Sequence, residues 1–167
     1  MPLPHAPSSS RGFTLIELMV VVVIATILLS IAVPSYMSQV RQSRRTEAKT
    51  ALLDLAGREE RYLSTNPAGY TSNPAFLGYG GFGVGNPIGS GYYYYLTVCS
   101  PAVAACVPGL KMPNPPAAPS YTIVASPVPG QSQVNDQQCQ LFAVDSDGQQ
   151  YAVDGAGNAQ TQFCWAN

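Results

Sequence analysis

The stretch Arg11–Pro34, RGFTLIELMVVVVIATILLSIAVP, decides how the rest of the chain is organised. From Phe13 to Val33 the only charged side chain is that of Glu17. As a helix rising 1.5 Å per residue, this segment would span roughly 31 Å, the thickness of the hydrocarbon core of a bilayer. The sequence therefore predicts a membrane-spanning helix close to the N-terminus.

The remaining sequence is sized for one small domain on that anchor. The chain has 167 residues, and its 15 glycines and 15 prolines indicate a head rich in loops and turns. Its net charge is −1 and only 10% of its residues are charged, which is too little of either sign to indicate a polyanionic partner. A nucleic-acid partner would need a local basic patch.

All four cysteines, Cys99, Cys106, Cys139 and Cys164, lie beyond the apolar stretch. An even number of cysteines in a small, loop-rich domain is typical of an oxidising compartment. The sequence has no Cys-x-x-Cys pair and its one histidine is His5, so disulfides are favoured over a zinc site. The local pairing, Cys99 with Cys106 and Cys139 with Cys164, is one of three possible connectivities. We expect no metal and no cofactor.

One long helix is predicted from about Thr14 to Leu63. Pro34 lies inside this pattern, and because proline removes a backbone hydrogen bond, we expect a kink or local melting near Ala32–Pro34; the alternative is a helix that simply starts after the anchor. Residues 35–64 read as an amphipathic half whose apolar face should pack on a sheet. The apolar stripe consists of Ala48, Ala51, Leu52, Leu55, Tyr62 and Leu63. The charged residues largely off it are Arg44, Arg45, Glu47, Lys49, Asp54, Arg58, Glu60 and Arg61.

Beyond the helix the sequence predicts a loop over residues 65–91 and then an antiparallel sheet. Four strands rich in β-branched and aromatic residues are expected: Tyr92–Val98, Tyr121–Ala125, Gln140–Val144 and, after a turn at Asp145–Gly148, Gln149–Val153. The fold class is thus α+β, with one face of the sheet on the helix and the other facing solvent or a neighbouring subunit. Tyr92–Tyr95 suggests a stacking platform, but at most two of these side chains share a face, so packing is the better interpretation.

The nine residues from Gly12 to Val20, GFTLIELMV, resemble the prepilin cleavage and methylation motif of type IV pilins and the related type II secretion pseudopilins. The resemblance implies that residues 1–12 are a leader, that prepilin peptidase cuts between Gly12 and Phe13, and that Phe13 is then N-methylated. The segment from Tyr121 to Cys139, followed by a strand, an Asp-Gly turn and Cys164-Trp165, is similar to the C-terminal half of PilE-like minor pilins, in which the last disulfide frames a surface-exposed loop. Four cysteines depart from the pattern of major pseudopilins, which commonly carry a calcium-binding loop; Asp145, Asp147 and Asp154 are expected to form turns instead.

Glu17 is a candidate assembly residue. A carboxylate in an apolar helix costs roughly 2.5–3.5 kcal/mol on insertion scales, so it marks a functional site unless it snorkels to the interface. The resemblance implies that Glu17 pairs with the Phe13 amine of a neighbouring subunit in a filament. It also implies that Pro34 is a point where the helix loosens during assembly.

A basic group, Arg41, Arg44, Arg45 and Lys49, follows the membrane segment. The positive-inside rule would place it in the cytoplasm, whereas the cysteines and the leader place the head in the periplasm, which we favour. A solvated helix face is the simplest account of this group; lipid phosphates, acidic neighbours and DNA are the alternatives. DNA is possible as a partner but no other feature of the sequence supports it.

Taken together, the expected protein is a minor subunit of a type IV pilus. Its predicted parts are a cleaved leader (residues 1–12), a transmembrane and filament-core helix (13–34) and a globular head (35–167), made of an amphipathic helix (35–64), a loop (65–91) and a sheet with a disulfide-bounded C-terminal loop (92–167). Before assembly it would lie in the inner membrane with its head in the periplasm, and afterwards in an extracellular pilus. The expected partners are other pilin subunits, prepilin peptidase, the inner-membrane assembly machinery and the membrane.

The roles expected from this reading are adhesion, twitching motility, pilus assembly or DNA uptake. The alternatives are a pseudopilin of a type II secretion system, a DNA receptor or adhesin at the pilus tip, and an anchored periplasmic domain that never polymerises. The sequence shows no phosphate loop or metal-ligand cluster, and no histidine remains after leader removal to activate a nucleophile, so catalysis is not expected.

Overall fold

The computed structural model describes residues 12–166, so all of the predicted leader except Gly12 lies outside the described residues. The chain divides into two compact units between Gln39 and Val40. The second unit, from Val40 onward, is called the head below.

Helix α1 (Leu15–Thr65) begins directly after Thr14. The Thr14 hydroxyl accepts a hydrogen bond from the backbone N–H of Glu17 at 3.3 Å, which satisfies one donor of the first helical turn. Helical structure continues through Pro34, so the local melting that was one expectation there is not present. The helix ends two residues beyond the predicted Leu63, where Asn66-Pro67 follows.

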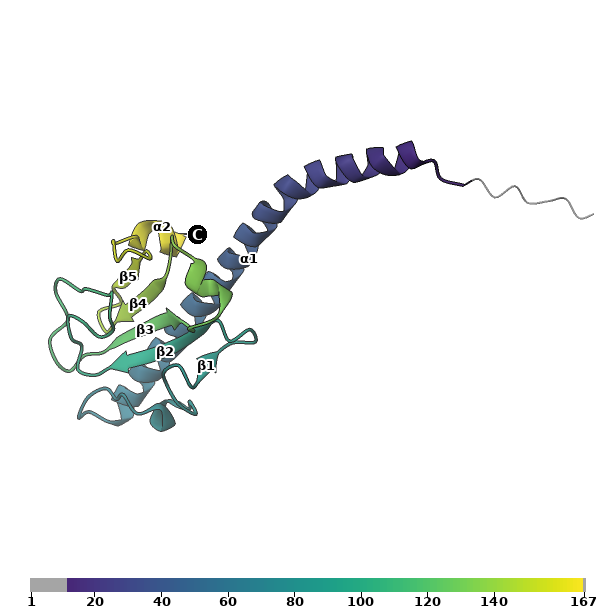
Figure 1. Cartoon of the computed structure of the whole chain (residues 1–167). Coiled ribbons are helices and arrows are strands. Elements are labelled where there is room, and N and C mark those ends of the chain that lie inside the picture. The colour runs from purple at the N-terminus through teal and green to yellow at the C-terminus, as the bar shows by residue number, and fades with distance from the viewer. Residues whose placement is uncertain (1–11, 167) are drawn as a thin grey trace, which may run out of the picture. The chain divides into compact units, whose positions relative to one another are not determined.

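The head contains a five-stranded antiparallel sheet in the order β1-β2-β3-β4-β5 (Figure 1). The strands are β1 (Pro87–Ile88), β2 (Tyr94–Cys99), β3 (Thr122–Pro127), β4 (Leu141–Asp145) and β5 (Gln150–Val153). The α+β class is confirmed, but the predicted count of four strands is wrong. β1 lies within the segment 65–91 that was expected to be loop, and it is too short to show a strand pattern; it forms because it pairs with Tyr94 and Tyr95 of β2.

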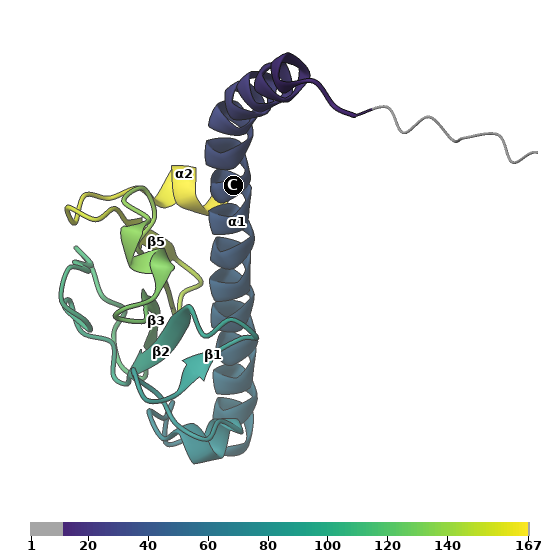
Figure 2. The same ribbon diagram turned by 45° about the vertical axis from the view of Figure 1, so that its right-hand side comes forward.

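One face of the sheet packs on α1, as predicted. Ala48, Leu52 and Leu55 of the helix are fully buried in a core that also contains Ile123 of β3 and Phe142 of β4. These helical positions recur every three or four residues, so one side of α1 carries the contact. Figures 1 and 2 show this part of α1 along one side of the sheet.

The other face of the sheet is also covered, which corrects the expectation that it meets solvent or a neighbouring subunit. Val107, Leu110 and Met112, from the segment between β2 and β3, pack against residues such as Val124 and Ala143 in a second core. The alternation of side chains along a strand explains the two cores, because Val124 points away from the face that carries Ile123.

Three short helices complete the described chain. They are the 3₁₀ helices η1 (Pro74–Leu77) and η2 (Ser132–Asn135) and helix α2 (Thr161–Ala166). η1 adds regular structure to the predicted loop 65–91, and α2 lies in the expected C-terminal loop. Neither was predicted from the sequence, because four to six residues are too few to show helical periodicity.

Candidate functional site

The N-terminal part of α1 carries the most exposed apolar surface in the described chain. Every residue from 12 to 39 is exposed, and the segment is long and apolar enough to cross a membrane. Two of its hydroxyl groups bond to the helix itself: Thr26 donates to the carbonyl of Val23 at 2.8 Å, and Ser30 donates to that of Ile27 at 2.7 Å. These two hydroxyls are therefore satisfied within the helix, as a hydrocarbon environment requires.

The predicted processing and assembly residues lie at the start of this segment. Gly12 and Phe13 precede α1, and Phe13 is 77% exposed. Glu17 is exposed in the first helical turn. The pattern Thr14-x-x-Glu17 is that of a capping box, and a negative charge here also complements the helix dipole. This local role was missed in the sequence, although the Thr-x-x-Glu spacing could have revealed it.

The basic group after the membrane segment is not a uniformly solvated helix face. Arg44 stacks over the Tyr93 ring at 3.7 Å and donates hydrogen bonds to the Tyr93 and Ser132 hydroxyls. Lys49 donates to the carbonyl oxygen of Cys164 at 3.3 Å. Partial burial and the charge of nearby Arg45 lower the pKa of Lys49. The solvated-face expectation is wrong for these residues because Tyr93 and Ser132 lie against Arg44 and the C-terminal segment lies against Lys49.

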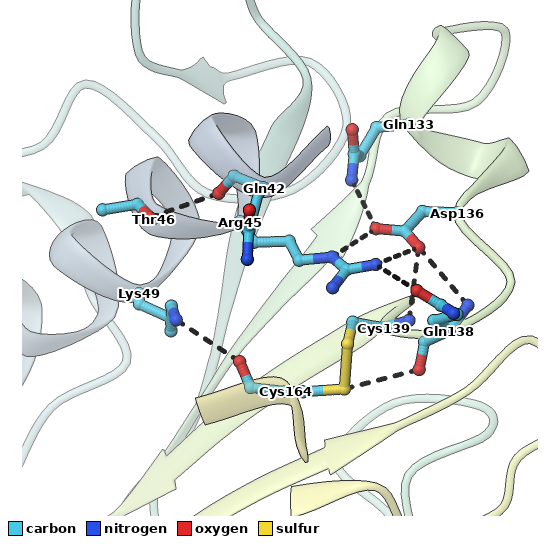
Figure 3. Close-up of polar contacts among 9 residues, drawn as sticks. All are labelled: Gln42, Arg45, Thr46, Lys49, Gln133, Asp136, Gln138, Cys139 and Cys164. Carbon is cyan, nitrogen blue, oxygen red and sulfur yellow. Dashed lines mark hydrogen bonds and ion pairs between the residues drawn. A yellow bond between two sulfur atoms is a disulfide. The ribbon is translucent and has the colours of Figure 1, made fainter. Parts of the chain in front are cut away.

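Arg45 departs furthest from the expectation, because its side chain is buried. Its Nε and Nη2 donate to both carboxylate oxygens of Asp136, at 2.7 and 2.8 Å (Figure 3). Asp136 also accepts hydrogen bonds from the Gln133 side chain and from the backbone N–H groups of Gln138 and Cys139. Such a bidentate pair fixes geometry as well as charge. The network joins α1 to the segment that leads into the second disulfide.

The structure brings the four cysteines together as Cys99–Cys106 and Cys139–Cys164, with Cα atoms 5.9 and 5.7 Å apart. The second disulfide attaches α2 next to β4, and Cys139 is fully buried. The bond from Lys49 to Cys164 and the network from Arg45 to Cys139 reach this disulfide from the same helix (Figure 3). The C-terminal segment is thus joined to the residues before β4 by the disulfide and to α1 by the Lys49 side chain.

Glu59 is a second buried charged residue that the sequence analysis did not single out. Its side chain is fully buried, Oε2 accepts a hydrogen bond from the backbone N–H of Thr71 at 3.2 Å, and Oε1 has no hydrogen-bond partner among residues 12–166. Burial, with a smaller contribution from the neighbouring Glu60 carboxylate, raises the pKa of Glu59 to about 7. Glu59 therefore holds the segment after α1 at an electrostatic cost.

The spacing of positions along α1 indicates that both Arg45 and Glu59 are buried. Arg45 and Glu59 extend the buried series Ala48, Leu52 and Leu55 by one step at each end, at intervals of three and four residues. A charged residue in phase with an apolar stripe is buried with it and requires a partner.

The acidic residues near the C-terminus form turns, as expected. Asp145 accepts the backbone N–H groups of Asp147 and Gln149 and the hydroxyl of Tyr151. Asp154 accepts hydrogen bonds from the Asn158 side-chain amide and from the backbone N–H groups of Asn158 and Ala156, and these hydrogen bonds lower its pKa. Within residues 12–166 no cluster of three or more His, Cys, Asp or Glu residues is placed to hold a metal ion.

Comparison with known proteins identifies the family. Residues 34–143 match the family described as type IV minor pilin ComP, DNA uptake sequence receptor, and residues 7–33 match the prokaryotic N-terminal methylation motif. The chain belongs to the ComP family of type IV minor pilins. The resemblance drawn from GFTLIELMV is confirmed, and such a minor pilin is anchored in the membrane by its apolar helix and assembled into an extracellular pilus.

A second comparison finds a relative that is similar to part of this minor pilin. Over 55 residues the chain is 46% identical to the type IV major pilin protein PilA of Myxococcus xanthus (strain DK1622). The match covers 33% of this chain and 25% of that pilin, so the chain spans about a quarter of the length of this relative.

Proposed function

We propose that this minor pilin enters a type IV pilus through its N-terminal helix, alongside other pilin subunits. The observation that carries the proposal is the exposed surface of residues 15–33, in which Glu17 is the one charged side chain and Thr26 and Ser30 are the other polar ones. An apolar surface of this kind is stable only in lipid or against other apolar helices. Before assembly the bilayer supplies that contact, and in the filament the helices of neighbouring subunits replace it.

The first residues of the helix would direct this exchange. Prepilin peptidase cuts between Gly12 and Phe13 and leaves a free amine one helical turn from Glu17. The inner-membrane assembly machinery then takes up the processed chain. In the filament this amine pairs with Glu17 of the neighbouring subunit, since either charge alone would be stranded among apolar side chains. Pro34, which lacks a backbone N–H, is the point where α1 can open when subunits pack.

The test is the Glu17→Ala variant, expressed beside the wild type in a piliated strain. We expect processing at Gly12 to continue and the amount of this pilin in sheared filaments to fall at least ten-fold. Mass spectrometry of the filaments should find a methylated Phe13 N-terminus in the wild type. Asp147→Ala, an exposed acid in the head, is the matched control and should leave incorporation unchanged. Normal incorporation of Glu17→Ala would refute the pairing.

A role as DNA receptor is a second candidate, favoured by the description of the matched family. At the C-terminal end of α1 the head has a hollow of about 410 Å³, lined in part by Arg61, Tyr62 and Phe76. The Tyr62 and Phe76 rings stack at 5.8 Å, and Arg61 is exposed. A cation beside exposed aromatic rings is the combination that holds a phosphate backbone and stacks bases.

Arg61→Gln tests this second role without touching the membrane helix. DNA uptake should fall while the number of pili and the incorporation of the protein stay unchanged, and binding of the purified pilin to DNA should weaken with less salt dependence. Unaltered uptake and DNA binding would exclude this hollow as the DNA-binding site.

We also propose that the mature pilin is not an enzyme, because leader removal takes away its one histidine and all four cysteines are bonded to one another.

A further inference from the structure

A groove of about 570 Å³ lies between α1 and β1 on the head. Its α1 side consists of Thr46, Glu47, Thr50, Ala51 and Asp54, and its other side of Tyr79, Pro87, Ile88 and Gly89. The volume is in the range of ligand-binding clefts, about 300–1,000 Å³, and the lining combines apolar surface with a few polar groups.

The two carboxylates of the groove are in different situations. Asp54 accepts hydrogen bonds from Arg58 and from the Tyr79 hydroxyl, so its charge is balanced. Glu47 accepts the backbone N–H of Ser90 at 3.0 Å, and the ion pairs found in the described chain, Arg45–Asp136 and Arg58–Asp54, do not include it. The groove therefore offers an aromatic wall next to a carboxylate that can pair with an incoming cation.

The head also presents the complementary chemistry. The segment Lys111–Pro119, KMPNPPAAP, has four prolines and one lysine, and most of it is exposed. Lys111 is exposed between Leu110 and Met112, which are both buried in the second core. The Met112 backbone N–H donates to the Ala104 carbonyl, so the cation is presented on an ordered loop.

The groove and this segment lie at opposite sides of the same head. β1 pairs with the start of β2, at Tyr94 and Tyr95, whereas the segment follows the other end of β2, at Cys99. The segment also covers the sheet face opposite α1. Figures 1 and 2 both show the loops between β2 and β3 away from β1. The segment is thus presented to another molecule and not to the groove of its own chain.

We propose that the segment Lys111–Pro119 of one copy docks in the α1–β1 groove of a second copy. Pro113, Pro115 and Pro116 lie extended against Tyr79, Pro87 and Ile88, as proline-rich peptides do on aromatic grooves, and Lys111 pairs with Glu47. Because the two surfaces differ, the contact is heterologous and leaves a free groove on one copy and a free segment on the other. The inference deepens the filament role proposed above, on which it rests for the source of the neighbouring copy.

The test uses the full chain in membrane vesicles, before any filament forms. A photo-crosslinking amino acid at exposed Asn114 should give a covalent dimer whose linked peptides map to residues 46–54 or 79–89. Thr50→Trp, which fills the groove, should reduce this dimer at least five-fold. Leu53→Trp, on an exposed position of the same helix outside the groove, is the matched control and should leave the dimer unchanged.

A second variant changes Lys111, which lies outside the groove, so that its effect does not depend on how the groove tolerates Thr50→Trp. Lys111→Glu places like charges together and should also reduce the dimer several-fold, whereas Lys111→Arg should preserve it. Absence of the dimer, linkage to another region or to another protein, or indifference to both Thr50→Trp and Lys111→Glu would overturn the docking proposal. Failure of the wild type to enter filaments would instead overturn the proposed function, because the crosslink is measured without filaments.

Discussion

Glu59→Gln should stabilise the protein at alkaline pH and have little effect at acidic pH. The substitution keeps the size of the buried side chain and an oxygen that can accept the Thr71 N–H, but it removes the ionisable group. Folding raises the pKa of Glu59 from 4.5 to about 7, because burial penalises the charged form. The folded protein therefore binds the proton more tightly than the unfolded chain does.

The direction of the pH dependence follows from this linkage. Between pH 4.5 and about 7 the folded state holds more protons than the unfolded state, so Glu59 lowers stability progressively as the pH rises. At 1.36 kcal/mol per pKa unit, the penalty is on the order of 3 kcal/mol at pH 8, about 2 kcal/mol at pH 6 and below about 1 kcal/mol at pH 5. Glutamine carries no such penalty at any of these values.

Thermal unfolding of the full chain in detergent, followed by near-ultraviolet circular dichroism, measures the effect. For a head of this size roughly 3–5 °C in Tm corresponds to 1 kcal/mol, so Glu59→Gln should raise Tm by about 10 °C at pH 8 and by only a few degrees at pH 5. Glu60→Gln, at an exposed neighbouring carboxylate, is the control and should give a much smaller difference. A Tm gain independent of pH, or a loss at pH 8, would refute the electrostatic account of Glu59.

Three further predictions concern the head, and each is measured by thermal unfolding of the full chain. Asp136→Ala leaves the buried Arg45 charge without its partner and should cost about 3–5 kcal/mol, whereas Asp147→Ala at an exposed turn should change little. In the chain-entropy model, serine in place of both Cys139 and Cys164 should cost about 3–4 kcal/mol, and serine in place of both Cys99 and Cys106 about 2–3 kcal/mol, because the Cys139–Cys164 disulfide closes the longer loop. The reverse order would contradict that model. Leu110→Ala should cost about 2–4 kcal/mol because it opens the second core, while Lys111→Ala should stay within about 0.5 kcal/mol, and equal effects would mean that the loop does not pack on the sheet.

The sequence sufficed for those parts of the fold that repeat a pattern. The membrane segment, the stripe from Ala48 to Leu55 and the four longer strands all show periodicity over several turns or residues. β1 and the cover formed by Val107, Leu110 and Met112 do not, because they lie in glycine- and proline-rich segments where tertiary contacts alone select the conformation. For this reason the sequence predicts four strands, whereas the sheet has five.

For the candidate site, prediction from the sequence is limited by the separation of contacting residues along the chain. The roles of Gly12, Phe13 and Glu17 are predicted from a contiguous motif, which needs no knowledge of the fold. Arg45 was assigned to a solvated face because charge was given more weight than position, although it is in phase with Ala48. Its partner Asp136 lies 91 residues away, and no local pattern relates two residues at that separation.

Arg45 and Glu59 lie at the two ends of the buried stripe of α1, and each holds a different segment of the head to this helix. Arg45 holds the segment between η2 and β4 through Asp136, and Glu59 holds the segment after α1 through Thr71. Along the helix they are separated by about 21 Å, so their contributions to stability should be nearly additive. Loosening one segment by substitution at Arg45 should therefore leave the other attached at Glu59. The apolar residues between them pack the helix on the sheet, while the Arg45 and Glu59 side chains each bond the segment that lies at their end of the stripe.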